Sequence, residues 1–390
     1  MVLQAELKAF GVSGERGFLP EPDPLRLLPA RFAAFEELAG ELPRLLPAGR
    51  VRAEVARLPP FDASALGSEA ERRRAMLLLS FLGHAFVWGG AEPAARLPAR
   101  LAVPWAEVAA ALGRPPILSY ASYALDNWRR LDPEGPIALG NLALLQNFLG
   151  GADEDWFILV HVEIEAKAAP LLRAAGPAQA AAREGRHSAL EQELSAMAEA
   201  LEGLATSLLR MPEWCDPAIY FRRVRPWIHG WKDHPALPGG VVYEGVAAHA
   251  GLPRRFRGET GAQSSIVPVL DAVLGVEHEE DPLRAYLREM RDYMPPGHRA
   301  FLERLEAAGS VRAAVQERRA ANPALAEAYE NCLHWLERFR STHLEYASRY
   351  IFHQSPQAAA NPTEVGTGGT PFMRYLRKHR DETARARRGP

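Results

Sequence analysis

The longest uninterrupted periodic pattern in the sequence lies between residues 325 and 354. This stretch contains no proline or glycine. Its apolar side chains recur at steps of three and four, at Leu325, Tyr329, Cys332, Leu336, Phe339, Tyr346 and Tyr350. Such steps keep side chains on one face of an α-helix. The sequence therefore predicts a long helix that buries one face against other elements.

A histidine interrupts this apolar stripe. His343 lies between Phe339 and Tyr346, where a bulky aliphatic residue is expected, whereas His334 falls on the opposite face. An imidazole on a packed face needs a partner for its ring nitrogens. Two partners fit the pattern at this point. One is a backbone carbonyl that accepts a hydrogen bond, and the other is haem iron, which takes a single axial imidazole.

A second imidazole, His161, lies on another predicted apolar face. Within residues 156–169 it shares that face with Phe157, Ile164 and Ala168. Its spacing is compatible with two interpretations. It is either a hydrogen-bonded core histidine or a functional group of a buried site.

Arg225 is the third candidate. It follows Phe221 by four residues, so both side chains face the same way on a helix, and Pro226 is expected to move Arg225 out of helical geometry. A guanidinium beside an aromatic ring suits the capture of a carboxylate. The alternative is a solvent-exposed surface, which we expect for Arg222 and Arg223.

Composition narrows the class of protein. The chain has 390 residues, of which 47% are hydrophobic and 24% charged, and a formal net charge of −2. These values are typical of a soluble globular protein and argue against nucleic acid as a partner.

No apolar stretch is long enough to span a membrane, and the start of the chain lacks an export signal. Cys215 and Cys332 form no metal-binding spacing. We expect a cytoplasmic protein.

Helical patterns separated by proline and glycine breaks predict an all-α fold with two domains. Gly150 and Gly151 are the strongest hinge signal, so we place a smaller N-terminal domain at 1–150 and a larger one at 151–390. We also expect an irregular arm over 1–24, a helix over 118–131, and a short strand or turn within 239–246.

Two further segments are assigned from local sequence. Gly366-Thr367-Gly368-Gly369-Thr370 lacks the lysine of a phosphate loop. We interpret it as the end of a mobile lid over about 355–370, with a plain linker as the alternative. His229 and His234 flank a predicted loop, and we expect both at the surface.

The ordered motifs of this chain resemble those of the indoleamine 2,3-dioxygenase family. The matching stretches are PPILSY at 115–120, DNW at 126–128, GWK at 230–232, VYEG at 242–245, GAQSS at 261–265, YMPP at 293–296 followed by HR at 298–299, RSTHL at 340–344 and GTGGT at 366–370. Together they cover roughly residues 75–385. Each motif is weak by itself, but their shared order is specific.

The resemblance implies a haem b held among the helices of the larger domain. His343 matches the proximal ligand of the iron. Asp271 and Arg340 match a supporting pair near that ligand, and Ser264 and Ser265 match a segment beside the haem. An electron donor that keeps the iron ferrous is a further implied partner.

The resemblance also implies a reaction and a substrate pocket. The family inserts both atoms of O2 across the indole C2–C3 bond of tryptophan, which gives N-formylkynurenine. His161 is then the candidate catalytic residue on the distal side. The implied substrate-binding residues are Tyr120, Phe157, Tyr220, Phe221, Arg225 and Thr367.

Three residues depart from the family pattern. His161 replaces a small serine, Tyr220 replaces a phenylalanine, and Tyr123 replaces a small residue. Their polarity leaves open L-tryptophan, a substituted tryptophan or another indole. The alternatives to dioxygenation are a different oxidation or rearrangement of an indole, a haem-binding sensor without turnover, and a helical interaction protein without a cofactor.

Overall fold

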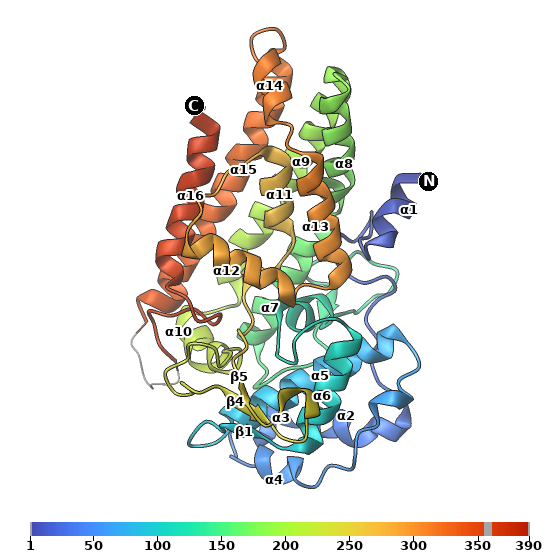
Figure 1. Cartoon of the computed structure of the whole chain (residues 1–390), viewed down its shortest axis with the longest axis vertical. Helices are drawn as coiled ribbons and strands as arrows, with labels where there is room; N and C mark the ends of the chain where they lie inside the picture. The colour runs from blue at the N-terminus through green and yellow to red at the C-terminus, as the bar shows by residue number, and fades with distance from the viewer. Residues whose placement is uncertain (1, 355–360, 389–390) are drawn as a thin grey trace.

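The computed structural model describes residues 2–354 and 361–388, and it confirms an all-α fold (Figure 1). The first half contains α1 (Val2–Ala9), α2 (Ala33–Gly40), α3 (Leu42–Leu45), α4 (Val51–Val55), α5 (Glu69–Trp88), α6 (Ala99–Ala111), α7 (Ala152–Lys167), α8 (Ala169–Arg183) and α9 (His187–Leu209). The second half contains α10 (Pro217–Ile219), α11 (Ile266–Leu274), α12 (Pro282–Met290), α13 (Pro296–Ala308), α14 (Arg312–Arg318), α15 (Pro323–Ala347) and α16 (Phe372–Arg388). The described strands are short: β1 (Arg96–Leu97), β2 (Arg129–Arg130), β3 (Leu142–Ala143), β4 (Val241–Tyr243) and β5 (Pro253–Arg254).

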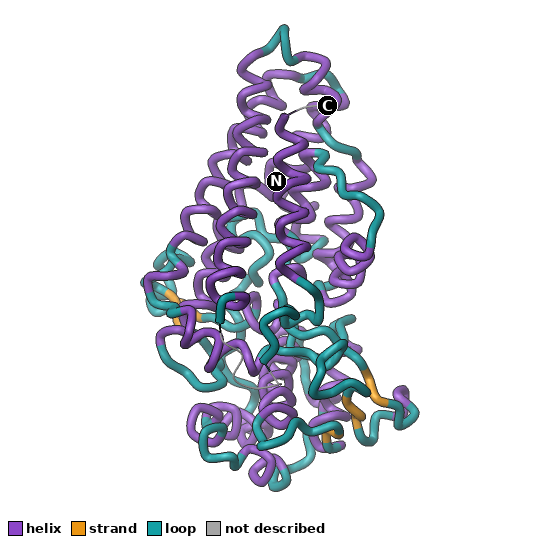
Figure 2. The backbone as a smooth tube through the Cα atoms, turned by 90° about the vertical axis from the view of Figure 1, so that its left-hand side faces the viewer, coloured by secondary structure: helices purple, strands orange, loops and turns teal. Residues whose placement is uncertain are grey.

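Long helices build one end of the molecule. α8, α9, α15 and α16 run along the long axis (Figure 1), and Figure 2 shows that this end of the molecule consists mainly of long helices. α15 packs on both α9 and α16. The contact with α9 joins two apolar stripes, and the Cys332 thiol of α15 donates to the carbonyl of Leu194 in α9 at 3.1 Å. This packing rigidly holds the helix that carries His343.

The other end of the molecule contains a second core around α5, which is buried along most of its length. Ser68 caps α5 by accepting a hydrogen bond from the Glu71 N–H at 3.1 Å. β1 pairs in parallel with β4, and β4 pairs antiparallel with β5. Residues 241–243 therefore join the core of the N-terminal segment, and the boundary near residue 150 stays a prediction.

α15 has clear local determinants at both ends. Asn322 accepts a hydrogen bond from the Leu325 N–H at 3.1 Å, and Pro323 occupies the first turn, where its missing N–H costs nothing. After Ala347 the helix widens into a π-helical turn over Ser348–Phe352. The long helix predicted over 325–354 is thus confirmed, with a change of winding at its end.

Some local expectations were wrong. The arm over 1–24 contains α1, and the helix expected over 118–131 is a π-helical turn at Ala121–Leu125 that ends before β2. His229 and His234 are buried, because both rings pack against Trp88 of α5. These side chains are covered by a segment far away in the sequence, which local pattern cannot reveal.

Arg225 also departs from expectation. Its backbone is helical, with φ −56° and ψ −38°, although Pro226 follows it. The chain accommodates this by passing from a π-helical turn, Tyr220–Val224, into a 3-10 turn, Arg225–Trp227. The expected shared face with Phe221 is present, since the guanidinium lies 5.6 Å from the centre of that ring.

Among the residues that the structure describes, no helix combines the length and the apolar character that a bilayer span requires.

Candidate functional site

A cavity of about 260 Å³ is walled by side chains of α7, α11, α12, α15 and α16. The loop segments around residues 259–264 and 366–370 complete the wall. Most of the lining is apolar or aromatic, and a few polar groups converge among these side chains. This combination is typical of a small-molecule site.

His343 projects into this cavity from the last turns of α15. Phe339, Tyr346 and Tyr350 line the same wall, because they belong to the same helical stripe. The His343 ring is accessible from the cavity, yet the surrounding protein buries it enough to lower its pKa to about 4. The nearby His161 ring adds to this effect, because two protonated rings would repel each other. Among the described residues, none hydrogen-bonds to this ring. His343 is a neutral imidazole with an unused lone pair.

His161 lines the cavity from α7. Its Nδ1 lies 2.7 Å from the carbonyl oxygen of Phe157, one helical turn earlier. Because a carbonyl only accepts, Nδ1 carries the proton and Nε2 is the acceptor nitrogen. Burial lowers the pKa of the His161 ring, and this effect is larger than the opposing effect of the hydrogen bond to Phe157. His161 is therefore neutral. Its Nε2 makes no hydrogen bond to any described residue and is available to a ligand N–H.

Arg340 and Asp271 form a buried ion pair at the cavity wall. Arg340 Nη2 donates to both Asp271 carboxylate oxygens, at 2.9 and 2.7 Å. Arg340 also reaches Thr383 of α16, and His278 bridges Asp271 and Glu382. The network ties α11, α15 and α16 together one turn before His343.

A carboxyl group supports the cavity wall from behind. Glu165 lies one helical turn after His161 and accepts hydrogen bonds from the Tyr120 hydroxyl at 2.9 Å and from the Ser264 hydroxyl at 2.8 Å. Burial raises the pKa of Glu165 to about 7, although these hydrogen bonds oppose the effect. Ser264 lines the cavity, whereas Tyr120 holds its place beside the His161 ring at a centroid distance of 5.9 Å.

The described part of the proposed lid, residues 361–370, packs against the cavity. Thr367 Oγ1 donates to the Glu259 carbonyl at 2.5 Å, and Arg257 Nη1 donates to the Gly368 carbonyl at 2.7 Å. A Cβ atom on Gly368 would lie 2.6 Å from the Tyr286 hydroxyl, so only glycine fits there. Residues 355–360 of the predicted lid lie outside the described residues.

Comparison with known proteins identifies the family to which this site belongs. The family model described as indoleamine 2,3-dioxygenase matches residues 6–386. The chain belongs to the indoleamine 2,3-dioxygenase family. It is 37% identical to indoleamine 2,3-dioxygenase 1 of Rattus norvegicus and 35% identical to indoleamine 2,3-dioxygenase 2 of Homo sapiens. Each alignment covers 97% of this chain, and 95% and 94% of those two proteins.

One fungal relative is named for a modified substrate. The chain is 33% identical to a 6-hydroxytryptophan 2,3-dioxygenase of Fusarium equiseti, over 97% of both chains. Family membership confirms the resemblance drawn from the ordered motifs. The protein is an oxidoreductase of the indoleamine 2,3-dioxygenase type.

The structure brings eight of the predicted site residues to the cavity wall: Phe157, His161, Tyr220, Ser264, Asp271, Arg340, His343 and Thr367. Four others stand behind the wall. Tyr120 and Ser265 are buried, and Ser265 Oγ donates to the Met294 sulfur at 3.3 Å. Phe221 and Arg225 are buried against each other. The roles assigned to these residues stay predictions.

Sequence reasoning missed two carboxyl groups, Glu165 and Glu259. Glu165 belongs to the helix of His161 at a spacing of four, which is a signal that could have found it. Glu259 lines the cavity from an irregular segment, and no periodic pattern marks it.

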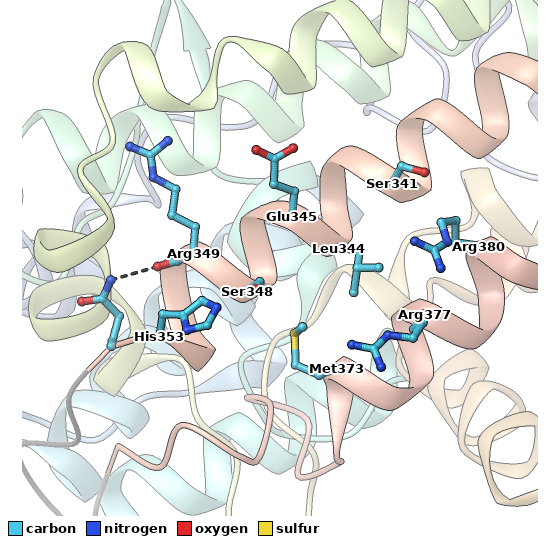
Figure 3. Close-up of a pocket in the computed structure, with 10 residues that line it drawn as sticks. Ser341, Leu344, Glu345, Ser348, Arg349, His353, Met373, Arg377 and Arg380 are labelled. Carbon is cyan, nitrogen blue, oxygen red and sulfur yellow. Dashed lines mark hydrogen bonds between the residues drawn. The ribbon is translucent and has the colours of Figure 1, made fainter.

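Two other features lie beside the site. His278, His379 and Glu382 offer ligand atoms within 4.8 Å of one another, but both His278 nitrogens are already hydrogen-bonded to carboxylates. A groove between α15 and α16 is lined by Leu344, Arg377 and others, as Figure 3 shows. Its lining does not include His343, and it forms no part of the cavity.

Proposed function

We propose that this protein is a haem-dependent dioxygenase that inserts both atoms of O2 across the indole C2–C3 bond of L-tryptophan or a close derivative. The product would be N-formylkynurenine or its analogue. The observation that carries the proposal is the unpartnered, neutral ring of His343 in an apolar cavity, among the residues that the structure describes. Such a ring lacks the hydrogen bond that a core histidine requires, and it offers the single imidazole that haem iron takes.

The residues around His343 fit a haem b. Val267 of α11, Leu287 of α12 and Leu376 of α16 contribute apolar surface to the wall, which suits the flat face of a porphyrin. A neutral imidazole is also the required form of a metal ligand. When bound, haem iron supplies the activation of O2 that amino-acid side chains cannot provide, and an electron donor keeps it ferrous.

The chain itself positions the substrate. His161 Nε2 is a free acceptor on the described cavity wall, and it suits the indole N–H. Phe157 packs 4.8 Å from the His161 ring and provides an aromatic surface beside it. The aromatic lining and residues 366–370 would limit the access of water to a bound substrate. Holding the indole in one orientation is the main contribution that such a site makes to the rate.

The buried Arg225 favours an enzyme that binds an amino-acid substrate over a haem sensor that binds only a diatomic gas. It is fully buried, and no described carboxylate pairs with it. Burial lowers its pKa to about 10. A buried guanidinium without an anionic partner is costly unless a ligand supplies one. A sensor without turnover has no use for this group.

A ring-substituted tryptophan is the second candidate substrate. The relative from Fusarium equiseti carries 6-hydroxytryptophan in its name. The hydroxyl of Tyr123 is buried without a hydrogen-bond partner among the described residues, and its ring lies 6.4 Å from that of Phe157. A polar substituent on the indole would give this hydroxyl a partner.

The decisive experiment combines spectroscopy with product analysis. Purified, haem-loaded protein should change its absorption spectrum on addition of L-tryptophan under O2. With labelled O2, the product mass should rise by both labelled atoms. Incorporation of one labelled atom would instead indicate mono-oxygenation. A colourless protein that takes up no haem would contradict the proposal altogether.

A further inference from the structure

One basic and one acidic side chain are buried near the cavity without an ionic partner among the described residues, and Arg225 is the first. One Nη atom donates to the side chain of Asn361, and the other donates to the Val365 carbonyl at 2.6 Å. Its Nε is buried and has no partner in the described ranges. These contacts are all neutral, so they leave its positive charge uncompensated.

Glu259 is the second such group. It is 5% exposed and lines the cavity. Its backbone is held on both sides, because its N–H donates to the Ile228 carbonyl at 3.1 Å and its carbonyl accepts from Thr367. Within the described part of the chain, no donor or cation reaches its carboxyl group. Burial raises its pKa to about 8. A buried, unpaired acid in a cavity wall is typical of a functional group.

Arg225 and Glu259 both shift the pKa of Tyr220. Burial raises the pKa of Tyr220, the Arg225 charge lowers it, and the Glu259 charge raises it. The two groups lie on the same side of the site, because the Val365 carbonyl accepts a hydrogen bond from Arg225 and Thr367, two residues later, donates to the Glu259 carbonyl. They nevertheless do not form an ion pair with each other. An anion acceptor and a cation acceptor that stay apart match a ligand that carries both charges.

We propose that Glu259 binds the α-ammonium group of an amino-acid substrate whose carboxylate is bound by Arg225. This inference rests on the proposed function and specifies its substrate class. The site would select the zwitterion of an indole α-amino acid. Tryptamine lacks the carboxylate that Arg225 would bind, and indole-3-propionate lacks the ammonium that Glu259 would bind, so each would leave one of these buried groups without its ionic partner.

The test compares dissociation constants measured by calorimetry on haem-loaded protein. Glu259→Gln keeps the shape of the side chain but removes its ability to form a carboxylate when an ammonium group binds. It should weaken L-tryptophan binding by roughly 10- to 100-fold, the range of a charge-assisted contact. Binding of indole-3-propionate should change less than about threefold, because that ligand has no ammonium to lose. Glu259→Asp should retain part of the preference for L-tryptophan.

Glu165→Gln is the matched control, since it removes a second buried acid whose carboxylate is already hydrogen-bonded to Tyr120 and Ser264. It should leave the ratio of the two dissociation constants unchanged. Equal weakening of both ligands by Glu259→Gln, or no weakening of L-tryptophan, would overturn the inference. If wild-type protein binds L-tryptophan through Glu259 but does not oxidise it, the proposed function fails and the ammonium site survives.

Discussion

At the scale of single residues, the His343 ring is exceptional because it lines an apolar cavity, is neutral and has no hydrogen bond to a described residue. We expect His343→Ala to fold but to lose stable haem binding, since no other described imidazole lies on that helical wall of the cavity. Haem content and the absorption spectrum measure this. His334→Ala, on the opposite face of α15, should leave both unchanged. A full complement of haem with an unaltered spectrum in His343→Ala would show that another group binds the iron.

Arg225 gives the second prediction at this scale. Removing one partner of a buried charge-assisted pair costs on the order of 2–4 kcal/mol. Arg225→Leu should therefore lower kcat/KM for L-tryptophan by roughly 30- to 1000-fold. Arg222→Leu changes an exposed side chain and should have little effect. Because Arg225 also holds Asn361 and Val365, the melting temperature should be measured alongside. Equal losses at positions 222 and 225 would refute the anchoring role.

His161 gives the third prediction at the scale of single residues. With Nδ1–H bound to the Phe157 carbonyl, only Nε2 can accept the indole N–H. His161→Ser should keep haem and some activity, because the histidine orients the substrate and is not an obligatory base. It should also reduce the penalty on 1-methyltryptophan, which has no N–H to donate. Steady-state kinetics with both substrates test this. Loss of all turnover with haem retained would instead assign acid–base chemistry to His161.

At the scale of elements, the glycine-rich segment 366–370 depends on close backbone approach. Gly368→Ala would place a Cβ atom 2.6 Å from the Tyr286 hydroxyl. Such overpacking costs about 1–3 kcal/mol of folding stability, so the melting temperature should fall, and displacement of the segment from the cavity wall should lower kcat/KM for L-tryptophan. Gly239→Ala is the control, because a Cβ atom added there would have nothing within 4 Å and its φ is not in the left-handed region.

The predicted mobility of this segment is tested by hydrogen exchange. If it acts as a lid, amides at residues 366–370 should exchange more slowly when L-tryptophan is bound. Exchange at equal rates with and without the substrate would mean that the segment is a fixed part of the wall.

At the scale of the whole molecule, the position of α16 depends on a charged network. Burial alone would lower the pKa of His278, but its hydrogen bonds to Asp271 and Glu382 raise it to about 9. The folded state therefore favours the protonated ring. This stabilisation is complete below the ordinary pKa of 6.5 and is lost as the pH rises through 9.

We consequently expect the melting temperature to fall between about pH 6.5 and pH 9, and His278→Gln to flatten that fall. His353→Gln, an exposed histidine beside the end of α15, should keep the wild-type profile. If the melting temperature of His278→Gln depended on pH as that of the wild type does, the network would contribute nothing to stability.

Periodicity in the sequence determined the helices of this protein and the faces that they bury. The stripe of α15, the cap at Ser68 and the turn from Asp216 to Pro217 follow from interactions within a few residues. The same local information placed His343 and His161 on apolar faces. The order of the motifs then indicated the family.

Only the tertiary structure decided which side chains meet. His229 and His234 are buried by Trp88, and the π-helical turns at Ala121–Leu125 and Tyr220–Val224 depend on packing that no local pattern encodes. The unpaired state of Glu259 within the described chain is also a tertiary property. A sequence specifies that a carboxyl group is present, but its burial and lack of a partner depend on segments that meet it from far along the chain.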